Sequence, residues 1–216
     1  ILRFFRFHAV YGDPEGGIDA EGYAACAAHA AGIDGLSRER VGAEVRKLLA
    51  APDPAPAVAA MAQAGILARV LAGADPRALA TLVHLEGGLQ PRWQRRLAVI
   101  GGENLADALR LSRADIVSIS RIRDEIGSLK SAAALGWKLG PIEAQDVLLC
   151  RAALFEQPLP PAWQTDVARG AEAVFPVTAA DLMPALSGAA LGAKLREAEA
   201  RWLASDLTLT KAQLLG

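Results

Sequence analysis

The sequence predicts an all-α protein, a multi-helix bundle of roughly a dozen short helices joined by short loops. Hydrophobic residues make up 52% of the chain but aromatic residues only 5%, because much of the apolar content is alanine, the strongest helix former. Alternating β-branched runs, which are typical of strands, are nearly absent. Clusters of glycine and proline divide the chain into short segments, and most of these carry apolar residues at helical spacing.

The first predicted helix starts at the beginning of the sequence, with no polar residues leading into it. Leu2, Phe5 and Ala9 stand at i, i+3 and i+7 and so share one face. Arg3 and Arg6 are also three residues apart and share another face. The pattern predicts a rigid helix that presents two positioned cations beside bulky aromatic residues.

A helix rich in small residues is predicted over residues 19–31, and glycines at positions 32 and 35 end it. Ser37 is predicted to cap the helix that follows. The apolar stripe of that helix consists of Val41, Val45, Leu48 and Leu49. Its other side carries Arg40, Glu44 and Lys47, which can pair along the helix.

Prolines within residues 51–56 separate this helix from the central part of the chain. Residues 66–71 are predicted to form a short apolar turn. The pair Asp75–Pro76 predicts the N-cap and first position of a further helix, which ends at glycines 87 and 88. Pro91 begins another helix, which ends at glycines 101 and 102.

Ser112 is predicted to cap a helix whose apolar residues are Ile116, Ile119, Ile122 and Ile126. Pro141 opens the next helix, and the proline-rich residues 157–161 form the second strong break. A helix follows near residues 163–175. The last long helix carries Leu191, Leu195, Ala198 and Trp202 on one face.

The two strongest breaks predict three regions. The first is a helical region over residues 1–51, the second a helical body over 52–156 and the third a helical tail over 157–216. No repeat of fixed length is visible, which argues against a solenoid.

The charge balance and the cysteine content limit the classes of function. The formal net charge is −1, so the chain is not a DNA-coating protein, and any nucleic-acid contact must come from a local basic patch. No apolar segment is long enough to span a membrane, and the N-terminus does not resemble a signal peptide. Cys26 and Cys150 fit two buried thiols of a reduced protein, so we expect a cytoplasmic location.

No catalytic constellation can be recognised. His8, His29 and His84 are isolated in the sequence, no phosphate-binding loop is present, and no pair of aspartates with metal-ligand spacing follows a strand. We therefore predict no catalytic residue, no metal ligand and no cofactor bound by this chain alone.

Basic residues gather in three places. The first is Arg3 with Arg6. The second consists of Arg38, Arg40, Arg46 and Lys47, and the third of Arg92, Arg95 and Arg96 beside Trp93. For the second and third clusters an ordinary solvated helix face is the favoured explanation over a binding site. Solvation explains the first one poorly, because its two arginines lie among bulky apolar residues.

Residues 2–7, LRFFRF, resemble the neck helix of the bacterial class II tRNA nucleotidyltransferase and poly(A) polymerase family, the CCA-adding enzymes. In that family a Glu-Asp-x-x-Arg motif runs into an Arg-x-x-Arg-x-x-Arg-Phe pattern. Arg3 and Arg6 with Phe7 match the latter part of it. We expect the Glu-Asp-x-x-Arg motif to lie upstream, ending one residue before Ile1.

Three further stretches resemble the same family in the right order. They are LSRERV at residues 36–41, LRLS at 109–112 and VTAADL at 177–182. Ala189 stands where the family usually has proline, so the local turn can differ there. The resemblance spans almost the whole chain.

This resemblance implies a neck, a body and a tail whose catalytic head lies outside the chain. In the family the head holds Mg²⁺ through carboxylates and transfers CMP and AMP from CTP and ATP to the 3′ end of tRNA. Arg3 and Arg6 would complete the nucleotide pocket, and Arg38, Arg40, Arg46 and Lys47 would contact RNA. The implied partner is tRNA, with ATP or CTP bound through the head. Whether the parent adds all of CCA, part of it or poly(A) stays open.

The main alternative is a helical protein-interaction scaffold with no role in RNA binding. A stand-alone enzyme is disfavoured because no triad, carboxylate pair or metal cluster is visible. The alternative predicts that replacing Arg3 and Arg6 with alanine changes nothing in the activity of a full-length protein.

Overall fold

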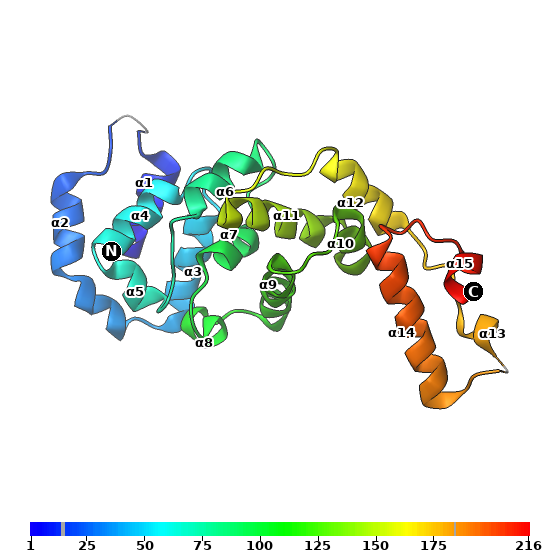
Figure 1. The fold of residues 1–216 in the computed structure, drawn as a ribbon. Coiled ribbons are helices and arrows are strands. Elements are labelled where there is room, and N and C mark those ends of the chain that lie inside the picture. Colours follow the sequence, from blue (N-terminus) through cyan, green and yellow to red (C-terminus); the bar gives the residue numbers. More distant parts are fainter. Residues whose placement is uncertain (14–15, 184) are drawn as a thin grey trace. The chain divides into compact units, whose positions relative to one another are not determined.

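The structure, a computed structural model, describes residues 1–13, 16–183 and 185–216 (Figure 1). Within these ranges the chain forms fifteen α-helices and one 3-10 helix, and the β-structure is an isolated antiparallel bridge between Ala74 and Gly101. The all-α prediction is confirmed. Among the described residues no helix has the length and apolar character that a membrane span requires.

The helices of the first half are α1 (Leu2–Tyr11), α2 (Ala20–Ala28), the 3-10 helix η1 (Ala30–Gly35), α3 (Arg38–Leu49), α4 (Ala55–Gln63), α5 (Ile66–Val70), α6 (Leu79–Glu86) and α7 (Trp93–Ile100). Those of the second half are α8 (Leu105–Leu109), α9 (Arg113–Ile126), α10 (Ala132–Leu139), α11 (Pro141–Phe155), α12 (Trp163–Glu172), α13 (Ala179–Leu182), α14 (Gly188–Ala204) and α15 (Lys211–Leu215).

Contacts between residues divide the chain into two compact units. Unit 1 comprises Ile1–Ile126 and Leu149–Pro158, and unit 2 comprises Gly127–Leu148 and Leu159–Gly216. The sequence suggests three regions, with boundaries at residues 51 and 157. These boundaries differ from those of the two compact units, and the three-region division stays a prediction.

Unit 1 is built around α3, which packs against α1, α7 and α8. The predicted apolar stripe of α3 is its buried face, with Val41 fully buried and Leu48 3% exposed. Gly42 allows α8 to approach closely, since a Cβ atom there would lie 1.9 Å from the carbonyl oxygen of Leu109. The helix that carries the second basic cluster is therefore fixed on several sides.

Unit 2 contains a close crossing of α10 and α12. A Cβ atom on Gly136 would lie 2.2 Å from Val167 O, and one on Gly170 would lie 1.9 Å from Ala133 O. The two backbones touch because both crossing positions are glycine. A separate apolar cluster buries Val177, Ala198, Trp202 and Leu214.

Three local predictions need correction. Residues 66–70 form the helix α5 rather than a turn. Asp75 and Pro76 precede the helix by a short turn, because α6 begins at Leu79 and the carboxylate of Asp75 accepts the backbone N–H of Arg77. Ser37 is the N-cap of α3, but its side chain makes no capping hydrogen bond.

Candidate functional site

One face of helix α1 is apolar and buried, and another face is exposed to solvent. Leu2 is 6% exposed and Phe5 is fully buried, as the spacing of these residues predicted. The ring of Phe5 lies edge-on to those of Phe4 and Tyr23, with centroids 5.2 and 6.4 Å away. This packing fixes the rotation of α1 about its axis and therefore the direction in which Arg3 and Arg6 point.

Arg6 is held by a specific partner on another helix. Its Nε donates to Glu44 Oε2 over 2.7 Å, and the two side chains are 17% and 19% exposed. Glu44 belongs to α3, so the ion pair joins the first two basic clusters of the sequence. The carboxylate occupies the Nε edge of the guanidinium, which leaves the Nη edge directed elsewhere.

The two arginines also meet at one aromatic ring, that of Phe7. The guanidinium carbon of Arg6 lies 4.6 Å from the ring centroid and that of Arg3 5.7 Å. Both distances are in the range of cation–π attraction. Arg3 itself is exposed, so the pair combines one half-buried, fixed cation with one that solvent reaches.

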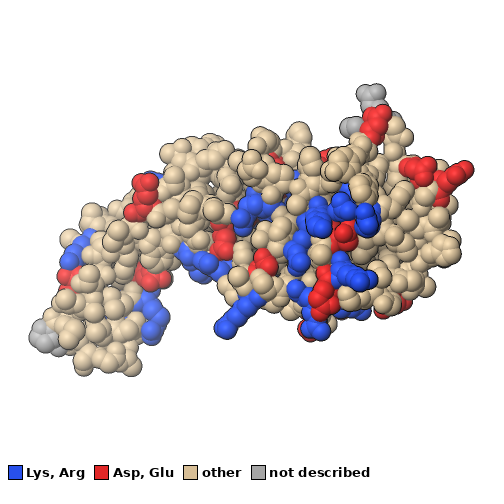
Figure 2. Space-filling view, turned by 180° about the vertical axis from the view of Figure 1, so that it is seen from behind, with Lys and Arg blue, Asp and Glu red and all other residues tan. Residues whose placement is uncertain are grey.

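The second basic cluster lies mostly at the surface of α3. Arg38, Arg40 and Lys47 are exposed, whereas Arg46 is partly buried. Arg40 and Lys47 stand one turn on either side of Glu44, and neighbours at this spacing share a helix face. The structure thus brings Arg6 of α1 to the α3 face that carries Arg40 and Lys47. In Figure 2, Lys and Arg side chains gather on the part of the visible face that belongs to unit 1, with Asp and Glu among them.

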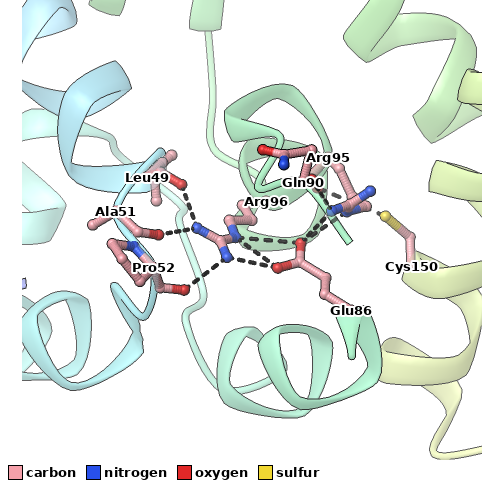
Figure 3. Close-up of polar contacts among 8 residues, drawn as sticks. All are labelled: Leu49, Ala51, Pro52, Glu86, Gln90, Arg95, Arg96 and Cys150. Atoms are coloured by element: carbon pink, nitrogen blue, oxygen red, sulfur yellow. Dashed lines mark hydrogen bonds and ion pairs between the residues drawn. The ribbon is translucent and has the colours of Figure 1, made fainter. Parts of the chain in front are cut away.

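The third basic cluster is not a solvated face, and that interpretation is wrong for two of its members. Arg95 is fully buried and Arg96 is 1% exposed, while Arg92 is partly buried. Glu86, at the end of α6, lies between the two guanidinium groups (Figure 3). Its carboxylate is 2.7 Å from Arg95 Nη2 and 2.6 Å from Arg96 Nη2.

Arg96 also binds the chain that leaves α3. Its Nη1 donates to the carbonyl oxygens of Leu49 and Ala51, and its Nη2 donates to that of Pro52 over 3.1 Å. These carbonyls lie at the C-terminal end of α3, where the helix dipole is negative and favours a cation. The buried arginine therefore fastens the end of α3 to α6 and α7 instead of meeting a ligand.

One cavity of unit 1 fits an anionic ligand less well than this surface does. A cavity of about 370 Å³ lies beside the C-terminal end of α1 and is lined by Asp13 and Asp53 among mainly apolar residues. Carboxylates repel phosphate groups. Among the described residues no cluster of His, Cys, Asp or Glu could hold a metal ion. The candidate site is accordingly the cationic surface of α1 and α3.

The sequence predicts Arg3, Arg6 and the α3 cluster as site residues, and the structure adds two further residues to this surface. Glu44 was expected to pair along α3, whereas its ion pair in the structure is with Arg6. Tyr11, whose ring centroid is 5.6 Å from that of Phe7, was not singled out. Its position four residues after Phe7 on a helix was the available signal, because such pairs are neighbours.

One comparison with known proteins covers α3 but not α1. A family model described as "Probable RNA and SrmB- binding site of polymerase A" matches residues 17–77, a range that includes α3. No curated protein matches the sequence.

A solved structure titled "The complex structure of CCA-adding enzyme with ATP" is similar over 99% of this chain, with a TM-score of 0.61 and 13% identity. This chain spans 58% of the length of that one. At such low identity the likeness establishes the fold. Residues 17–77 are thus similar to the RNA-binding segment described for polymerase A, and the chain has a helical fold similar to that of part of a CCA-adding enzyme.

Proposed function

We propose that this chain is the RNA-binding helical portion of a tRNA nucleotidyltransferase or poly(A) polymerase. The observation that carries the proposal is the cationic surface of α1 and α3, where Arg6 is fixed by Glu44 beside Arg40 and Lys47. The larger part of this surface lies within the segment that matches the polymerase A family model. Arg38 and Arg46, the other members of the second basic cluster, lie on other sides of α3, because residues six before and two after Glu44 do not share its helix face.

The surface suits folded RNA for physical reasons. Exposed cations release counterions when they neutralise phosphates, and this supplies affinity without reading sequence. A tRNA presents phosphates and 2′-hydroxyls in a fixed shape, which a rigid helical surface can follow. The closely packed α3 provides such rigidity, since Gly42 and Arg96 hold it against neighbouring helices.

Arg3 and Arg6 have a second role in the proposal, which is to bound the pocket for the incoming nucleotide. A guanidinium with one edge held by a carboxylate is pre-organised to donate from its other edge to a base or a phosphate. The carboxylates, the Mg²⁺ ions and most of the ATP or CTP site would come from a head outside this chain. The parent protein would act in tRNA processing in the cytoplasm.

Titration of fluorescent tRNA with the 216-residue chain over a salt series tests the RNA-binding part. We expect the logarithm of the association constant to fall linearly as the logarithm of the salt concentration rises. Arg40→Ala and Lys47→Ala should each weaken binding and reduce that slope by about 1. Arg196→Ala, which removes an exposed arginine from unit 2, is the matched control and should change neither quantity.

Failure to bind tRNA at low salt, or binding without a salt slope, contradicts the proposal. The first result would favour the alternative of a helical scaffold with no RNA role. Equal losses from Lys47→Ala and Arg196→Ala would show that the attraction is spread over the molecule and is not located on α3.

A further inference from the structure

Two aromatic rings on the outer face of α1 are not explained by packing. Phe7 is 43% exposed and Tyr11 is 74% exposed. Their ring centroids are 5.6 Å apart and their planes are inclined by 30°. By contrast, Phe5 of the same helix is fully buried, and Trp163 and Trp202 are at most 6% exposed. The chain has few aromatic residues, so two large rings next to each other at the surface indicate a binding role.

The two rings form one surface with the arginines of α1. The guanidinium carbons of Arg3 and Arg6 lie 5.7 and 4.6 Å from the centroid of the Phe7 ring. The bond from Arg6 to Glu44 holds the nearer guanidinium in place against the ring. We call Arg3, Arg6, Phe7 and Tyr11 the aromatic–arginine platform.

We propose that the aromatic–arginine platform binds unpaired RNA bases by stacking, with Tyr11 as the outermost ring. Aromatic side chains beside cations are the combination by which proteins hold single strands, because every base has a π-face and every nucleotide carries a phosphate. A duplex keeps its bases inside the helix, so it cannot use the rings in this way. The inference rests on the proposed RNA-binding function and specifies the form of RNA that α1 contacts.

Charge favours RNA over a protein as the occupant. The rings are bordered by two guanidinium groups, and within the described ranges the carboxylate of Glu44 already accepts from one of them, that of Arg6. Arg40 and Lys47 continue the positive surface on α3. An apolar protein surface would gain from the rings but would have to desolvate these cations. A strand of RNA satisfies both kinds of group at once.

The test uses a short single-stranded RNA that carries a fluorescent adenine analogue, and the blunt-ended duplex of this strand with its complement as the paired counterpart. Stacking quenches the analogue. We expect Tyr11→Ala to weaken single-strand binding about tenfold, to abolish the quenching and to leave the salt slope unchanged. Duplex binding should stay the same, because it depends on phosphates.

Two further variants control the result. Tyr11→Phe keeps the ring and should retain both the affinity and the quenching. Phe155→Ala removes another phenylalanine of unit 1, 51% exposed, and should have no effect. Circular dichroism should show unchanged helicity for Tyr11→Ala, because that side chain is largely in solvent.

The outcomes separate this inference from the proposed function. Wild-type single-strand affinity for Tyr11→Ala, with Lys47→Ala still weakened, overturns the platform and leaves RNA binding in place. An equal loss on single strand and duplex overturns stacking as the mode of contact. A change in oligomeric state caused by Tyr11→Ala would show that the rings bind protein, which also overturns the inference. Absence of all RNA binding removes the proposed function together with the platform.

Discussion

The guanidinium of Arg96 lies 2.6 Å from the carboxylate of Glu86, and the two side chains are only 1% and 4% exposed. Charged groups so deep in a protein are costly to desolvate, and they persist only where hydrogen bonds satisfy them. Here Glu86 accepts from two arginines, and Arg96 also reaches carbonyls at the end of α3. The cluster therefore determines where α3, and with it the cationic surface, is held.

Glu86→Gln should destabilise unit 1 by about 3–5 kcal/mol, since it leaves two buried guanidinium groups without their shared carboxylate. Hydrogen exchange of the amides in α6 and α7, followed by mass spectrometry, measures this loss. Peptides of unit 2 in the same sample serve as the internal reference. Glu103→Gln, a neutralisation at an exposed position, should leave the exchange unchanged. A loss below about 0.5 kcal/mol, typical of surface substitutions, would contradict the structural role of Glu86.

Arg96→Lys should cost about 2 kcal/mol although the charge is kept. An ammonium group donates from a single nitrogen, whereas the planar guanidinium of Arg96 donates from different nitrogens along its edges to Glu86 and to the carbonyl of Leu49. Urea unfolding of unit 1 measures the loss, and hydrogen exchange should locate it at the last turn of α3. Wild-type protection at that turn would show that the charge alone is sufficient.

Gly170→Ala should destabilise unit 2 by about 3 kcal/mol, because the new methyl group would meet the carbonyl of Ala133 and force α10 and α12 apart. Fluorescence of the buried Trp163 during denaturant unfolding reports on this unit. Gly127→Ala is the control, since a Cβ atom there meets nothing within 4 Å. Equal stability of the two variants would mean that the crossing is looser than described.

The carboxylate of Asp181 should titrate at unusually low pH. Hydrogen bonds from Lys211 and from the backbone and hydroxyl of Thr178 lower its pKa from 3.8 to about 2. A lowered pKa in the folded state stabilises the fold above the unfolded value and loses this effect as the pH falls toward the folded value. The attachment of α13 to α15 should therefore weaken between about pH 4 and pH 2.

A carbon-detected NMR titration of Asp181 measures this pKa directly. Lys211→Met should raise the pKa only part of the way to its ordinary value, because the bonds from Thr178 remain. Asp181→Asn should remove the local pH dependence. An Asp181 pKa near the ordinary value in the unchanged protein would contradict the described contacts.

The fold class was readable from the sequence because its causes are local. Alanine content, glycine and proline breaks and apolar spacing act within a few residues, and they placed α3, α9 and α11 correctly. Local signals failed at Asp75, where an acid followed by proline began a turn rather than a helix. The carboxylate there binds the N–H of Arg77 as in an Asx turn, and the sequence pattern is the same in both cases.

The site was readable only in part because its contacts are tertiary. Arg3 and Arg6 were identified by their position on one short helix, but the partner of Arg6 is 38 residues away. Arg95 and Arg96 looked like a solvated basic face, yet they are buried with Glu86. The apolar run over residues 97–100 was a local sign of a buried helix. No local sign reveals which carboxylate meets these arginines, since that depends on how α6 and α7 pack.

The hydrogen bond between Arg96 and the carbonyl oxygen of Pro52 constrains mutation at these two positions unequally. A carbonyl oxygen is present whatever residue is encoded at position 52, and the side chain of Pro52 is exposed. The contact therefore constrains the codon of Arg96 but leaves that of Pro52 almost unrestricted. In a saturation mutagenesis screen, position 52 should tolerate most substitutions and position 96 almost none.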